Sequence, residues 1–144
     1  MSVLDDLSEG FEESAQLLIK LADFSRNEPK VTPPEMLDAE DRAERLWYQL
    51  NDTDTIILDA MSADLWYLVE DGPYPPSKDP TDELREKFEQ AKKDDNLVEI
   101  AWALHECAKL ASGVEGARIR LHLWKSLKQE EMARRFEDLL SKLS

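Results

Sequence analysis

Arg118, His122 and Lys125 follow one another at intervals of four and three residues, which places all three on one face of a helix. With Arg134 and Arg135 on the next segment, they can form a small cationic patch that holds a carboxylate or phosphate group. Titration of His122 would make such a patch sensitive to pH at about 6.5. The alternative is an ordinary solvated helix face whose cations pair with nearby acids.

The other residues that could act in catalysis or bind a metal fit no catalytic or metal-binding pattern. Cys107 is the sole cysteine, and it lies on an apolar helical stripe where a thiol behaves as an inert small hydrophobe. His105 lies two residues before it, and residues two apart point away from each other on a helix. Asp52 and Asp54 resemble the start of a calcium loop but are better explained as a helix cap. We therefore expect no catalytic residue, no metal and no cofactor.

Most aromatic residues with polar tips come from the acidic half of the chain and the proline-rich loop 71–80; besides Tyr48 they are Trp47, Trp66, Tyr67 and Tyr74. Such residues are enriched at protein interfaces because they combine large apolar area with a hydrogen-bonding group. Packing in the core is the alternative. The pattern makes these four residues candidate binding residues.

The elements that must position these side chains are helices. Apolar residues recur at three- and four-residue intervals, predicting helices over about 3–24, 33–50, 55–69, 81–93, 97–111, 114–127 and 130–143. Gly10 allows a break in the first, and Thr81 is placed as an N-cap. Asp94, Asp95 and Asn96 end one helix and cap the next, and Gly113 is placed as a C-cap. No segment alternates as a strand would. The fold class predicted is all-α, a bundle of about seven helices that can be arranged as stacked helical hairpins.

Length and charge set the domain organisation. The 144 residues predict one helical domain, with an acidic half at 1–72 and a near-neutral half at 81–144 joined by the proline-rich loop 71–80. Residues 1–72 carry 18 acids and 5 bases, a net charge of −13, whereas residues 73–144 carry 14 and 13. Nucleic acid and anionic membranes require excess Lys and Arg, so neither is expected as a partner.

The compartment predicted is the cytoplasm. The first residues are acidic, whereas a secretory signal begins with positive charge followed by an apolar stretch. No apolar run approaches the roughly 20 residues that cross a bilayer. A lone cysteine suits a reducing environment.

The last two predicted helices carry a family resemblance. Residues 127–136 read LKQEEMARRF, where Ala133 opens the second helix three residues before Phe136, and Trp124 occupies a large aromatic position in the first. This stretch resembles a tetratricopeptide unit and covers about thirty residues. Lys128 and Leu140 depart from the pattern, which has glycine and alanine there. The resemblance implies a helical-hairpin scaffold of the kind that binds peptides.

Three functions are consistent with these observations. The first is a non-catalytic helical interaction module that binds a protein or peptide partner through an aromatic-lined groove. The second is an acidic inhibitor or immunity-type protein that covers a basic site on a toxin or nucleic-acid enzyme. The third is an enzyme of unknown class that uses Arg118, His122 and a nearby acid. Attraction between the acidic half and the basic tail also predicts a homo-oligomer.

Overall fold

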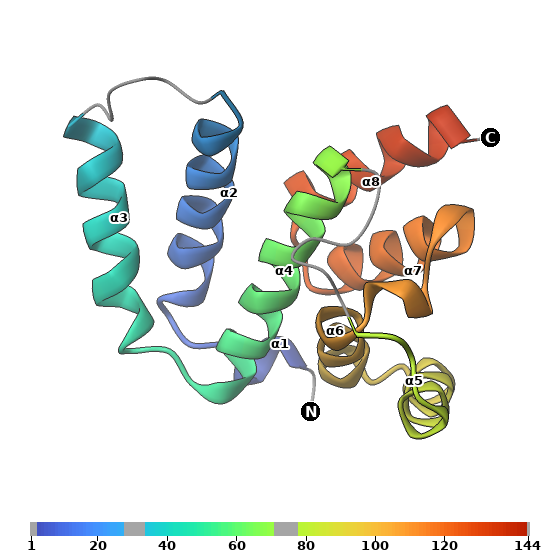
Figure 1. Ribbon diagram of the computed structural model, residues 1–144. Helices are drawn as coiled ribbons and strands as arrows, with labels where there is room; N and C mark the ends of the chain where they lie inside the picture. The colour runs from blue at the N-terminus through green and yellow to red at the C-terminus, as the bar shows by residue number, and fades with distance from the viewer. Residues whose placement is uncertain (1–2, 28–33, 71–77, 144) are drawn as a thin grey trace.

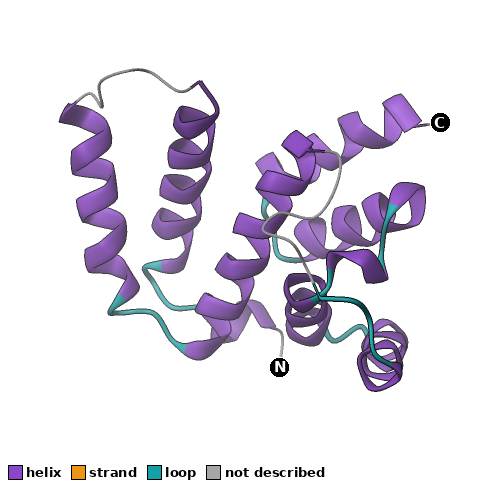
Figure 2. Ribbon diagram, viewed as in Figure 1, coloured by secondary structure: helices purple, strands orange, loops and turns teal. Residues whose placement is uncertain are grey.

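The helical architecture is evident in a computed structural model, which describes residues 3–27, 34–70 and 78–143. In these ranges the chain forms eight α-helices and a short 3-10 helix, without a strand (Figures 1 and 2). The helices are α1 (Val3–Asp6), α2 (Phe11–Asn27), α3 (Pro34–Trp47), α4 (Asp52–Glu70), α5 (Asp82–Asp94), α6 (Leu97–Glu106), the 3-10 helix η1 (Ala108–Leu110), α7 (Gly113–Ser126) and α8 (Glu130–Leu143). The predicted all-α bundle of about seven helices is confirmed.

The first predicted helix is divided into α1 and α2, as the position of Gly10 allowed. Asp54, at the start of α4, stabilises the segment between α1 and α2, because its carboxylate accepts hydrogen bonds from the backbone N–H and the hydroxyl of Ser8. The Asp54 backbone donates to the Asn51 side chain at 2.8 Å, and the Asn51 backbone donates back to Asp54 at 3.0 Å. Asn51 is therefore the N-cap of α4, and Asp54 is the buried third residue of the helix that completes a capping box with it.

Local caps also define α5 and α6. The side chain of Thr81 accepts a hydrogen bond from the Leu84 backbone, and that of Asn96 accepts one from Glu99. Between the two helices Asp95 adopts a left-handed conformation, at φ 51°. Both predicted N-caps are confirmed.

The predicted helix over 97–111 is wrong beyond Glu106. Cys107 is extended, η1 follows, and Gly113 begins α7 instead of ending the preceding helix. Two tertiary hydrogen bonds explain the interruption, since the Cys107 thiol donates to the Lys78 carbonyl and Arg120 donates to the Ala111 carbonyl. Neither bond has a signal in the local sequence.

The core gathers around α4, which packs against α2, α6 and α8, while α7 and α8 form a closely packed hairpin (Figure 1). The largest wholly buried apolar side chains are Ile57, Met61 and Leu65 of α4 with Trp124 and Phe136. α3 stands outside this core: its buried Met36, Ala39 and Leu46 do not join the main cluster, and it packs chiefly on α2. None of the described helices is long and apolar enough to cross a membrane.

Candidate functional site

The predicted cationic patch is divided by ion pairs with neighbouring acids. On α7, His122 Nε2 lies 2.6 Å from Asp95 Oδ1 and Lys125 Nζ lies 3.2 Å from Glu137 Oε1. Arg118 shares a shallow hollow of about 250 Å³ with His122 and Asp95. The hollow thus contains a carboxylate as well as cations, which weakens its attraction for an anion.

The two arginines of α8 are also paired and do not join the face of α7. Arg135 lies 2.7 Å from Asp23 of α2 and 3.0 Å from Glu131, while Arg134 binds Glu131 and Asp138. Hydrogen bonds from Arg134, aided by Arg135, lower the pKa of the Glu131 carboxyl to about 2. These arginines therefore form ion pairs within α8 and join α8 to α2.

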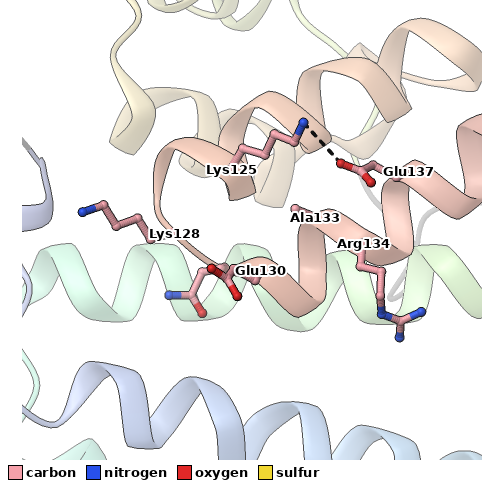
Figure 3. A pocket seen from close by; sticks show the side chains of 7 residues that line it. Lys125, Lys128, Glu130, Ala133, Arg134 and Glu137 are labelled. Carbon is pink, nitrogen blue, oxygen red and sulfur yellow. Dashed lines mark ion pairs between the residues drawn. The ribbon is translucent and has the colours of Figure 1, made fainter.

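A hollow of about 460 Å³ at the α7–α8 turn contains two of these predicted cations (Figure 3). Lys125 and Glu137 point toward each other there, whereas Arg134 turns away from them. Lys128, which follows the end of α7, adopts a left-handed conformation, at φ 58°. The cations that line this hollow face different directions and do not converge on one ligand.

The predicted aromatic residues fall into different environments. Trp47 and its neighbour Tyr48 are 45% and 81% exposed, whereas Tyr67 is buried under the guanidinium of Arg120, 4.1 Å from its ring centre. Trp66 is half-buried. Tyr74 lies outside the described residues. Of the predicted set, Trp47 is thus the residue that most clearly offers an exposed aromatic surface.

Trp47 lines an apolar groove of about 260 Å³, which we call the α2 groove. α2 packs against both α3 and α4, while those two make little contact with each other, so the groove lies between them over α2. Figure 1 shows α2 standing between α3 and α4. The lining residues are Ser14, Leu18 and Leu21 of α2, Ala43 and Trp47 of α3, and Leu58, Asp59 and Ser62 of α4.

Two polar groups of the α2 groove lack full compensation for burial. Ser14 is 7% exposed, and its hydroxyl has no hydrogen-bond partner among the described residues. Burial raises the pKa of the Asp59 carboxyl, and the charge of His105 lowers it in part. A buried polar group without a partner costs free energy that a bound molecule can recover. Sequence reasoning missed both residues, because the groove joins helices that are distant along the chain.

The rim of the α2 groove on α3 is acidic. Glu40 and Glu44 are exposed and lie three residues before Ala43 and Trp47, so they border the groove on the same side of the helix. The two arginines of α3 are engaged elsewhere, Arg42 with Glu13 and Arg45 with Asp41. α3 therefore presents more negative than positive charge beside the groove.

A second feature absent from the predicted set is a buried ion pair between α4 and α7. Arg120 donates to Asp64 at 2.9 Å, and the indole of Trp124 donates to the other oxygen of Asp64 at 2.8 Å. Burial raises the pKa of the Asp64 carboxyl, while Arg120 and Trp124 oppose that change. With both charges withdrawn from solvent, the pair joins helices and offers no access to a substrate.

The remaining candidates are His105 and Cys107. His105 is exposed, and Cys107 is buried with its thiol on the Lys78 carbonyl. No group of three or more metal-ligating side chains occurs within residues 3–27, 34–70 and 78–143. The α2 groove is accordingly the best-formed candidate site. Comparisons of the chain with protein-family models, with curated proteins and with solved structures found no significant match.

Proposed function

We propose that the chain is a non-catalytic helical interaction module that binds a protein or peptide partner through the α2 groove. The observation that carries the proposal is the 45% exposure of Trp47 at the edge of an apolar groove. Tryptophan is among the residues that contribute most to binding when a partner covers them. The groove volume, about 260 Å³, is small for a drug-sized ligand and suits a few side chains of a partner.

Affinity capture with quantitative mass spectrometry tests this function through one variant and its matched control. Trp47→Ala removes the aromatic wall of the groove, whereas Tyr48→Ala removes a neighbouring aromatic residue that does not line it. We expect at least one protein recovered by the wild-type chain to be lost with Trp47→Ala and retained with Tyr48→Ala. A recovered set that is the same for all three proteins would contradict the proposal.

The acidic surface favours a second candidate function, an inhibitor or immunity-type protein that covers a basic site. α3 has five acids and two arginines, and Asp38, Glu40 and Glu44 are exposed on it. Binding of this kind would weaken strongly between about 50 and 500 mM salt, because salt screens exposed charges. Unlike binding in the α2 groove, it would survive Trp47→Ala. Salt-independent binding would count against it.

Self-association and a cytoplasmic location complete the proposal. Within one molecule, Arg135 of α8 lies 2.7 Å from Asp23 of α2. The proposed homo-oligomer would need pairs of this kind between two copies. Elution as a monomer at low salt would contradict it. The unpaired Cys107 suits a reducing cytoplasm.

A further inference from the structure

The form of the α2 groove restricts the shape of its occupant. Its floor is one helix and its walls are two others, and α3 is 14 residues long, about 21 Å. A helix laid in such a groove inserts side chains spaced three and four residues apart, as amphipathic helices do in other grooves. The apolar side chains of Leu18 on the floor and of Leu58 and Trp47 on the walls match the apolar face of a helix of this kind.

Charge at the groove determines which amphipathic helix fits. Asp59 forms part of one wall, and Glu40 and Glu44 border the other. None of these three carboxylates has an ion pair within 4 Å among the described residues, although the charge of His105 acts on Asp59. The nearby Arg42 is already paired with Glu13. A basic occupant would supply the missing partners, and an acidic occupant would place like charges together.

We infer that the α2 groove accepts a basic amphipathic helix of a partner protein, with apolar side chains between α3 and α4 and Lys or Arg side chains beside Glu40, Glu44 and Asp59. The inference rests on the proposed interaction function and names the chemistry of the partner. Ser14, buried on the groove floor without a hydrogen-bond partner, is a second and independent sign that the groove is incomplete alone.

Two synthetic peptides provide the test, each about 18 residues long so that a helix can form. Both carry leucine at the same amphipathic positions, and they differ only in having lysine or glutamate beside the leucines. Fluorescence anisotropy measures their affinity for the full chain. We expect the lysine peptide to bind at least about tenfold more tightly than the glutamate peptide, since charge complementarity selects partners.

Variants separate the groove from general attraction to an acidic protein. Ala43→Phe fills the groove without changing its charge and should abolish the difference in affinity between the peptides. Glu40→Lys with Glu44→Lys should reverse the preference, whereas Asp82→Lys with Glu83→Lys, a matched change on the distant α5, should leave it unchanged. Equal affinity of the two peptides, or a preference unaffected by Ala43→Phe, would overturn the inference.

The outcome is distinguishable from failure of the proposed function. A partner whose capture requires Trp47, combined with equal binding of the two peptides, would overturn the basic-helix inference and leave the interaction function standing. If no captured protein depends on Trp47, the proposed function itself is overturned. If sedimentation shows that the groove is covered by a second copy of this chain, and Ala43→Phe separates the copies, the inferred partner is wrong.

Discussion

Charged side chains lie inside the protein where α4 meets α7 and outside it along α3. At the inner contact, Asp64 and Arg120 are almost wholly buried. Arg120 donates hydrogen bonds to Asp64 and to the Ala111 carbonyl, and Trp124 donates one to Asp64. Along α3 the acids are exposed and lie beside the apolar surface of Trp47. In the first arrangement the charges pair with each other inside the fold, while the second leaves both charge and apolar area available to a partner.

This contrast shows why the number of charges is a poor guide to their use. Arg120 is one base among 18, yet it joins α7 to α4 and covers the ring of Tyr67. Removing one member of a buried pair leaves the other without compensation. The acids of α3 are exposed, so we expect changes to them to have little effect on folding.

The largest effect is expected for Arg120→Ala, because it leaves the Asp64 carboxylate buried without its cation. Stability should fall by about 3–5 kcal/mol, the range for breaking a buried ion pair. Urea unfolding at pH 7 measures this. The double change Arg120→Met with Asp64→Leu should be less harmful than Arg120→Ala alone. A loss below about 1 kcal/mol for Arg120→Ala would mean that the pair is not buried as described.

Gly116→Ala tests how closely Gly116 packs against the Ala111 carbonyl and the Arg120 guanidinium. A Cβ at this position would overlap the Ala111 carbonyl oxygen and lie 2.7 Å from Arg120 Nη1. We expect a loss of about 1–3 kcal/mol, as for other overpacked interiors. Gly10→Ala is the matched control, because its Cβ would meet Leu46 at an ordinary 3.4 Å. Equal thermal unfolding of both variants would contradict the packing at Gly116.

Two tryptophans compare the exposed and buried regions directly. Trp47→Ala should lower stability by about 1 kcal/mol or less because the residue is 45% exposed, and Trp124→Ala by about 3–5 kcal/mol because it is wholly buried. Chemical denaturation of each variant gives the difference. A large loss for Trp47→Ala would show that its role is to stabilise the fold, and the α2 groove would lose its main support.

The smallest effect concerns the exposed pair of Glu131 and Arg134. The pKa of Glu131 is lowered from 4.5 to about 2, so its contribution to stability is complete above pH 4.5 and is lost as the pH falls toward 2. Glu131→Gln should therefore cost about 0.5 kcal/mol at pH 7, as exposed pairs do, and progressively less as the pH falls through about 2. Unfolding curves across this range check the sign. A constant difference between the two proteins would contradict it.

Features set by neighbouring residues were predictable from the sequence. The caps Thr81 and Asn96 act on backbone groups three residues away, and the break near Gly10 lies where a weak helix former stands. The end of α6 was not predictable, because the Ala111 carbonyl is taken by Arg120 of another helix. The same limit explains why the α2 groove was missed although Trp47 was identified.

The buried pair did leave a signal that spacing alone can reveal. Arg120 lies three and four residues before Leu123 and Trp124, so it shares their buried face, and Asp64 lies three residues after Met61. A charged residue in register with an apolar stripe indicates a buried partner. On the opposite face of α7 the cations are clustered in sequence, yet His122 and Lys125 lie beside the acids Asp95 and Glu137.

The indole N–H signals of the four tryptophans in a ¹H–¹⁵N NMR spectrum test the central claim most directly. Titration with the lysine peptide should shift the signal of Trp47 and leave that of Trp124, which is buried against Asp64, unchanged. A peptide that binds without moving the Trp47 signal would contradict the account, as would a shift of that signal that is the same with the glutamate peptide.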